Sequence, residues 1–266
     1  MVDRLLTFVH ISDTHLHQDP TYTGPFTDIV PRPGVEAMIQ QINALPFAVD
    51  FVLHTGDVMT DPPDDSAYEI ARAALGGLRY PVHYLAGNHD RVSGLQRVLM
   101  QRAPEFITPR LDYELAVNGV QILCLDSSIP DPDVHSGRLD PAQLAWLDAR
   151  CAAPDDRPLV VAVHHHALPL HAPWLDNIVL TNGEEFHQVL LGARHRLRGV
   201  FYGHIHESVV TVRDGISYYS VLSGWFQTRT WHNQQDAMNA PLYNPGFNVV
   251  TLTARDTFVR YYRVKM

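Results

Sequence analysis

The sequence predicts an α/β protein in which two sheet halves form one domain over residues 1–266. In the first half, short apolar runs alternate with segments whose apolar residues recur at helical spacing. This order is typical of a mainly parallel sheet with right-handed crossovers. In the second half the alternation is less regular and ends in antiparallel strand pairs. The chain shows no linker and no internal repeat, so we expect a single domain.

The first half contains three predicted strands and two predicted helices. The first strand is a continuous apolar run, as expected of a strand that is buried on both faces. In the first helix, Val35, Ile39 and Ile42 recur at the spacing of one helix face. The strands are expected at residues 5–11, 51–54 and 82–85, and the helices at residues 35–45 and 66–75.

The second half repeats strand and helix before it becomes antiparallel. Asp140, Pro141 and Gln143 mark a helix start, with Asp as the N-cap and Pro at the first helical position. Asp214-Gly215 lies between two apolar runs, as in a hairpin turn. Further strands are expected at residues 120–125, 159–163, 199–202, 209–212, 216–221, 249–252 and 257–264, and a further helix at residues 184–191.

Composition and charge exclude several classes of protein. A net charge of −9 argues against sequence-independent binding of nucleic acid, which needs a basic face. No apolar run approaches the ~20 residues of a membrane span. The N-terminal apolar segment is too short for a signal peptide with its cleavage site. We therefore expect a cytoplasmic protein with no membrane span and no nucleic-acid polymer as its partner.

Five short clusters of histidine, carboxylate and amide side chains each follow a predicted strand. Strand ends on one edge of an α/β sheet converge in space, so these side chains can meet in one site. Histidine is the commonest metal ligand among side chains, and 16 histidines are many for this length. The clusters are Asp13-Thr14-His15, Gly56-Asp57, Gly87-Asn88-His89-Asp90, His164-His165-His166 and Gly203-His204-Ile205-His206.

Taken singly, most of these clusters have a structural explanation. Asp13 and His15 point the same way on an extended segment, but a surface pair would look the same. A Gly-Asp pair is also a common turn. Three adjacent histidines cannot all face one ion, so at most one or two of His164, His165 and His166 are ligands. Five unrelated clusters of this kind at the ends of successive predicted strands are improbable by chance, so the sequence predicts a metal site.

The predicted ligand set is too large for one ion and suits two. Its mixture of oxygen and nitrogen donors favours Mn, Fe or Zn over Mg or Ca, which prefer oxygen ligands. No cysteine is implicated.

In these motifs the chain resembles the calcineurin-like metallophosphoesterase superfamily over residues 5 to about 206. Within that superfamily it resembles the class III cyclic-nucleotide phosphodiesterases and their glycerophosphodiesterase relatives. Supporting details are residues 11–16, Gly137 and Leu139 followed by Gln143, and the stretch from His164 to Asp176. The resemblance implies a four-layer α/β/β/α sandwich of two mixed sheets with flanking helices, and a metal site at the C-terminal strand ends.

The resemblance also implies the ligands of two metal ions. Asp57 is expected to bridge them. The first ion is assigned Asp13, His15, Asp57 and His206, and the second Asp57, Asn88, His165 and His204. The family usually has a proline two residues after the ligand histidine, where this chain has Ala167. His164 and His166 therefore stay open as alternatives to His165.

By the same resemblance, a hydroxide that bridges the two metals attacks phosphorus in line with the leaving oxygen. Such paired ions lie about 3.5–4 Å apart and lower the pKa of water to about 7. His89 is expected to protonate the leaving oxygen or to stabilise the charge of the transition state, and Asp90 to hold the His89 ring. Asn88, His89 and His206 are the expected substrate-binding residues.

The substrate class is a small phosphodiester, with cyclic nucleotides, cyclic AMP above all, as the first expectation. The alternatives are a broad phosphodiesterase on glycerophosphodiesters, phosphonate esters or phosphomonoesters, and a non-catalytic metal-binding scaffold. The aromatic segment 223–247, with Trp225, Phe226, Trp231, Tyr243 and Phe247, is expected to be a lid, a homodimer contact or a platform that stacks a nucleobase.

Overall fold

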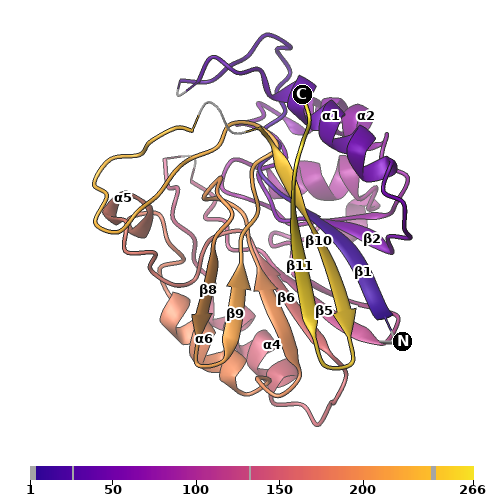
Figure 1. Ribbon diagram of the computed structural model, residues 1–266, viewed down its shortest axis with the longest axis vertical. Helices are drawn as coiled ribbons and strands as arrows, with labels where there is room; N and C mark the ends of the chain where they lie inside the picture. Colours follow the sequence, from indigo (N-terminus) through magenta and orange to yellow (C-terminus); the bar gives the residue numbers. More distant parts are fainter. Residues whose placement is uncertain (1–3, 26, 132, 241–243) are drawn as a thin grey trace.

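In the computed structural model, two β-sheets pack face to face and helices cover their outer faces (Figure 1). The structure describes residues 4–25, 27–131, 133–240 and 244–266. The α/β/β/α architecture that the sequence analysis expected is confirmed.

The first sheet has five strands in the order β11-β10-β1-β2-β3. Its three N-terminal strands are mutually parallel, and β10 and β11 join them as an antiparallel pair. The strands are β1 (Arg4–Ile11), β2 (Phe51–His54), β3 (Val82–Tyr84), β10 (Gly246–Thr253) and β11 (Thr257–Arg263).

The second sheet has six strands in the order β4-β5-β6-β7-β9-β8. Its four central strands are parallel, and each edge strand is antiparallel to its neighbour. The strands are β4 (Tyr113–Val117), β5 (Val120–Leu125), β6 (Leu159–Val163), β7 (Leu197–Phe201), β8 (Val210–Arg213) and β9 (Ile216–Tyr219).

The main helices are amphipathic and lie on the outer faces of the sheets. Met38 and Ile42 of α1 pack on Val9 of β1, and Phe186 of α6 packs in the cluster that contains Val161 of β6. The helices are α1 (Pro31–Asn43), α2 (Tyr68–Leu75), α3 (Val92–Gly94), α4 (Pro141–Cys151), α5 (Pro173–Asp176) and α6 (Gly183–Leu191). Shorter helical turns are Asp65–Ala67, Leu95–Leu99 and Pro104–Phe106. No helix in the described part of the chain is both long and apolar enough to cross a membrane.

Most predicted elements are found within a few residues of their expected bounds. Helix α4 begins as predicted, because the Asp140 carboxylate accepts from the Gln143 amide while the Gln143 side chain reaches back to the Asp140 amide. Helix α1 begins earlier than expected, at Pro31, whose fixed φ suits the first helical position.

Strand β4 was missed. Its burial alternates along residues Tyr113–Val117, and Asn118-Gly119 connects it to β5 with positive φ at both residues. That turn is a strong hairpin signal in the sequence.

Candidate metal centre

The five clusters all lie at the carboxyl ends of parallel strands. Asp13 and His15 follow β1, and Asp57 follows β2. The backbone ladder between these strands continues past their ends, since the amide of Asp13 donates to the Gly56 oxygen (3.0 Å) and that of His15 to the Asp57 oxygen (3.0 Å). Asn88 follows β3, and the remaining two clusters follow β6 and β7 of the second sheet. Both sheets therefore present these ends to one place.

Five of the predicted ligands have a left-handed backbone conformation. They are Asp13 (φ 53°), His15 (φ 44°), Asp57 (φ 52°), His204 (φ 69°) and His206 (φ 50°). In a residue with a Cβ this conformation costs about 1–2 kcal/mol. Such backbone strain gathers at functional sites, where the surrounding structure enforces it.

Three donor atoms form the first group, from Asp13, His15 and His206. His15 Nε2 lies 3.1 Å from His206 Nε2, and His206 Nε2 lies 3.5 Å from Asp13 Oδ1. The same His15 nitrogen lies 3.6 Å from Asp57 Oδ2. The Asp13 carboxylate is fixed by the backbone amide of His204, at 3.0 Å from Oδ2.

The second group contains Asp57, His164 and His204, and the backbone amide of His89, which directly follows Asn88, donates to Asp57 Oδ1 (2.9 Å). His164 Nε2 lies 3.3 Å from Asp57 Oδ2 and has no hydrogen-bond partner. The rings of His164 and His204 have centroids 5.1 Å apart. Asn88 Oδ1 is likewise buried without a partner. His165 also places a ring nitrogen within 4.8 Å of His164 and His204.

Four histidines direct one ring nitrogen into this centre because the other nitrogen is bonded to the protein. Such outer contacts fix the tautomer and orientation of metal-binding histidines. The pairs are His15 Nδ1 with Thr60 Oγ1 (2.9 Å), His164 Nδ1 with the Thr55 oxygen (2.7 Å), His204 Nε2 with the Ile178 oxygen (3.0 Å) and His206 Nδ1 with the Phe226 oxygen (2.9 Å). His165 differs, since Nδ1 contacts Ser127 Oγ (2.7 Å) and Nε2 the His135 oxygen (3.2 Å).

The charge of the centre also suits cations. Asp13 and Asp57 are 0% and 2% exposed, and among the described residues their ion-pair partners are histidines, with no lysine or arginine. Burying unpaired carboxylates is costly. Burial alone would raise the pKa of Asp57, but the nearby His164 and His89 hold that pKa well below its ordinary value. The two carboxylates, the orphaned Asn88 Oδ1 and the inward nitrogens fit two bound metal ions.

The ring of His89 is held by Asp61, which corrects the expectation that Asp90 holds it. His89 Nδ1 lies 2.9 Å from Asp61 Oδ1. Burial would lower the pKa of His89, but the carboxylates of Asp57 and Asp61 raise it to about 9. The Asp90 carboxylate instead accepts from three backbone amides, those of Val58, Met59 and Gly87, and from the Tyr68 hydroxyl. Asp90 therefore ties the loop after β2 to the loop after β3.

Two residues near the centre were missed by the sequence analysis. Asp61 lies four residues after Asp57, in a turn with φ 42°. His135 is exposed, places Nδ1 3.2 Å from Asn88 Nδ2, and has its ring 5.4 Å from that of His89. Its only signal in the sequence is its place two residues before Gly137, one of the residues that support the resemblance.

The aromatic segment divides into parts with different surroundings. Phe247 lies in β10, 1% exposed and stacked on Tyr262, so it is a core residue and stacks no base. Phe226 lies against the His206 ring, at 4.4 Å, and Trp231 is 49% exposed. Tyr243 is outside the described residues. The segment also holds the backbone of the first donor group, because Ser223 Oγ donates to the backbone carbonyl oxygen of Asp13 (2.8 Å).

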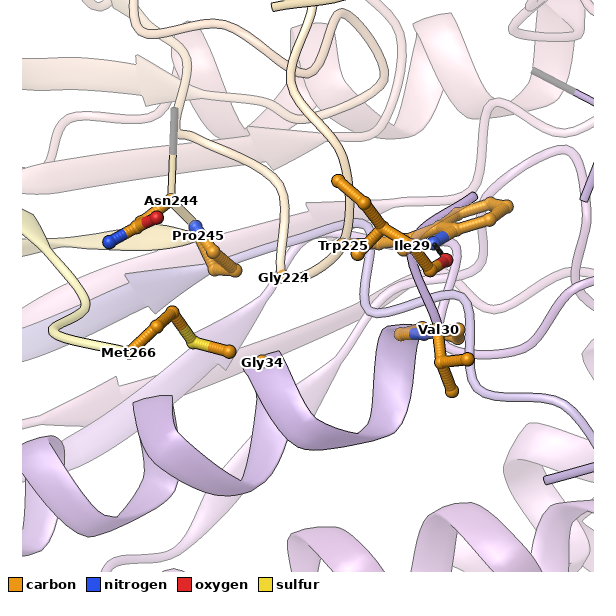
Figure 2. A pocket seen from close by; sticks show the side chains of 9 residues that line it. Ile29, Val30, Gly34, Gly224, Trp225, Asn244, Pro245 and Met266 are labelled. Carbon is orange, nitrogen blue, oxygen red and sulfur yellow. Dashed lines mark hydrogen bonds between the residues drawn. The ribbon is translucent and has the colours of Figure 1, made fainter. Parts of the chain in front are cut away.

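Trp225 lines a small cavity at the start of α1 (Figure 2). Its ring lies 5.2 Å from that of His15, and its Nε1 donates to the Ile29 oxygen (2.5 Å). The cavity measures about 150 Å³, and Gly34, Pro245 and Met266 are among the described residues that line it. None of the predicted ligands lines this cavity, so it is distinct from the metal centre.

Comparison with known proteins agrees with this geometry. The family model described as calcineurin-like phosphoesterase matches residues 6–208. The glycerophosphodiester phosphodiesterase GpdQ of Enterobacter lignolyticus is 30% identical over 77% of this chain and 73% of its own length. The 3',5'-cyclic adenosine monophosphate phosphodiesterase CpdA of Pseudomonas aeruginosa is 31% identical over 77% of this chain and 71% of its own length.

Solved structures share the fold at low sequence identity. A dimetal phosphatase from Danio rerio superimposes with a TM-score of 0.67 at 14% identity, over 99% of this chain and all of that one. The purple acid phosphatase PPD1 of yellow lupin gives 0.69 at 15% identity, over 97% of this chain and 51% of that one. The family match, the relatives and the buried Asp and His groups together assign this chain to the calcineurin-like phosphoesterases, a family of metal-dependent phosphoric ester hydrolases.

Proposed function

We propose that this protein hydrolyses small phosphodiesters with two bound metal ions, of Mn, Fe or Zn, and that cyclic nucleotides, cyclic AMP first, are its substrates. The observation that carries the proposal is the pair of donor groups that share Asp57. The similarity to CpdA supports cyclic AMP as the substrate, and the similarity to GpdQ supports glycerophosphodiesters as the alternative.

In this proposal Asp13, His15, Asp57 and His206 hold the first ion, and Asp57, Asn88, His204 and His164 hold the second. His164 takes the place expected for His165. Its free Nε2 faces Asp57 Oδ2, whereas both ring nitrogens of His165 contact other protein atoms.

Bound cations of this kind lower the pKa of water and neutralise phosphate oxygens. The chain supplies the remaining chemistry. In this proposal Asn88 and His206 also bind the phosphate, together with His89. His89 directs Nδ1 to Asp61, and its Nε2 has no hydrogen-bond partner among the described residues, so that Nε2–H is the donor to the leaving oxygen. Asp61 holds the ring in that orientation.

His164→Ala is expected to lose the second metal ion and at least about 100-fold in kcat, because a direct ligand matters more than the outer partners whose loss costs 10–100-fold. His165→Ala is expected to keep two ions per chain. Metal content by plasma mass spectrometry, together with kcat on bis(p-nitrophenyl) phosphate, checks both variants. Full metal content in His164→Ala with loss of an ion from His165→Ala would restore His165 as the ligand.

Asp61→Asn is expected to lower kcat by about 10-fold or more on esters with alkyl leaving groups, since general acid catalysis contributes about 10²–10⁴-fold. The loss should be small for p-nitrophenyl esters, whose leaving oxygen needs little protonation. The ratio of the two rates is the measurement. Asp19→Asn is the matched control, because Asp19 is exposed and its hydrogen bonds connect it only to neighbours in its own turn. Equal losses on both ester types would contradict the role of Asp61.

A hydrolysis panel tests the function itself. Mn-loaded protein is assayed on bis(p-nitrophenyl) phosphate, p-nitrophenyl phosphate, glycerophosphocholine and 3',5'- and 2',3'-cyclic AMP. We expect turnover of the diester and of a cyclic AMP. Turnover of glycerophosphocholine without cyclic nucleotides would replace the proposed substrate by the alternative. Turnover of none, with two metal ions bound, would support a non-catalytic scaffold.

A further inference from the structure

A polar side chain interrupts the apolar layer between the two sheets, directly behind the metal centre. Leu6 and Phe8 of β1 belong to the buried cluster that both sheets form, and His10 continues their row. His10 is 0% exposed, and its ring forms a T-shaped pair with that of Phe201 from the opposite sheet, with centroids 5.5 Å apart. Burying a polar ring is unfavourable unless it is hydrogen-bonded, so an aliphatic or phenyl side chain would be the simpler solution here.

Both ring nitrogens of His10 are bonded. Asn248, its register partner on β10, places Nδ2 3.4 Å from His10 Nδ1, and Thr55 Oγ1 lies 3.0 Å from His10 Nε2. Burial lowers the pKa of His10 to about 3, so the ring is neutral and carries one N–H. Because the Asn248 amide donates to Nδ1, Nε2 carries the hydrogen and donates to Thr55.

One end of this chain of contacts reaches the proposed second metal site. The Thr55 carbonyl accepts from His164 Nδ1 at 2.7 Å, and the opposite nitrogen of that ring faces Asp57. The direction of the His164 ring is therefore set by the orientation of the Thr55 peptide. Thr55 is 0% exposed and is held by His10 through its side chain and by the Ile11 oxygen through its amide (3.0 Å).

The other end reaches the loop of the first site. Asn248 Nδ2 donates to the backbone carbonyl oxygen of Ser220 at 2.9 Å. The hydroxyl of Ser220 in turn donates to the backbone carbonyl oxygen of Glu207 at 2.6 Å. Glu207 directly follows the proposed ligand His206. A continuous series of buried hydrogen bonds therefore connects the loop after β7 with the loop after β6. It passes through Asn248 and His10 of the first sheet.

We propose that His10, held by Asn248, is a positioning residue for the metal centre that fixes Thr55 and through it the direction of His164 Nε2. The inference rests on the proposed function only in taking His164 as a ligand of the second ion. His10 itself touches neither metal nor substrate. Outer contacts of this kind change metal affinity by about 10–100-fold when they are removed.

Stepwise binding of Mn²⁺ to the metal-free protein, measured by calorimetry, tests the proposal. His164→Ala first identifies the binding step that depends on this ligand. His10→Phe is expected to weaken that same step by about 10-fold or more and to leave the other step unchanged. His10→Gln, which can both donate and accept, should recover most of the affinity. Thr55→Val removes the same hydrogen bond, that between His10 and Thr55, with a side chain of equal size. It replaces His10→Phe in this test if His10→Phe does not fold.

Thr7→Val is the matched control, because Thr7 is also buried on β1 and joins it to β10 through Thr251, away from the metal loops. Unchanged Mn²⁺ affinities in His10→Phe and Thr55→Val would overturn the inference, and the proposed function would stand if the wild-type protein still turned over diesters. An equal weakening in Thr7→Val would overturn it too, since any disturbance of the sheet would then suffice. Wild-type protein that binds two ions but hydrolyses no ester would remove the proposed function and leave the positioning role of His10.

Discussion

Asp57→Asn is expected to lose at least one metal ion per chain and more than about 100-fold in kcat, a larger effect than the 10–100-fold typical of outer-shell changes. Asp57 is the carboxylate that both donor groups share, with Oδ2 3.6 Å from His15 Nε2 and 3.3 Å from His164 Nε2. The substitution keeps the size of the side chain and removes its charge. Metal content by plasma mass spectrometry and kcat on bis(p-nitrophenyl) phosphate measure the two losses.

Asp50→Asn is the matched control for this variant. Asp50 lies just before β2, whereas Asp57 lies just after it, and its carboxylate accepts from Arg4 and from the Thr7 amide. We expect Asp50→Asn to keep both ions and its activity. An Asp57→Asn protein that held two ions and turned over at the wild-type rate would end the proposal of a shared carboxylate.

Gly87→Ala is expected to lower kcat/KM by more than about 100-fold, because the new methyl group would push Asp57 out of place. A misplacement of about 1 Å in an active site can cost about 10²-fold in rate. A Cβ on Gly87 would overlap Asp57 Oδ1 and lie 2.7 Å from Asp57 Cγ. The backbone of Gly87 has no positive φ, so alanine suffers no conformational penalty there and the crowding acts alone. Overpacking of this kind also costs about 1–3 kcal/mol of unfolding free energy.

Steady-state kinetics and thermal unfolding check the Gly87→Ala variant against Gly192→Ala. At Gly192 the nearest atom to a new Cβ is the Val189 oxygen, at an ordinary 3.4 Å. Gly192→Ala should keep its activity and its Tm. Wild-type kinetics in Gly87→Ala would mean that the Asp57 carboxylate can move without consequence, against the tight packing of the loops after β2 and β3.

The place of the centre could be predicted from the sequence because it depends on backbone topology. Parallel strands bring their carboxyl ends to one edge, so Asp13, Asp57 and Asn88 converge whatever the details of packing. The choice among His164, His165 and His166 could not be predicted. It depends on which ring nitrogens find partners on other elements, such as the Thr55 oxygen for His164 and Ser127 for His165.

The partner of His89 escaped prediction for a related reason. Asp90 is the adjacent carboxylate in the sequence, but backbone amides of two loops draw it away from the ring. Asp61 reaches the ring because a turn with positive φ carries it back over the site. The surroundings of Trp225 and Phe247 likewise depend on how an aperiodic segment packs, for which hydrophobic spacing holds no signal.

The left-handed backbone of the five proposed ligand residues sets the stability of the protein against its activity. Each such residue costs about 1–2 kcal/mol, against the 5–15 kcal/mol by which a whole domain is usually stable. Glycine at one of these positions, such as His204, would relieve that cost and remove the ligand at once. Selection of variants for thermal stability alone would therefore favour the loss of metal-binding residues. A screen for more stable forms of this enzyme needs turnover as a second criterion.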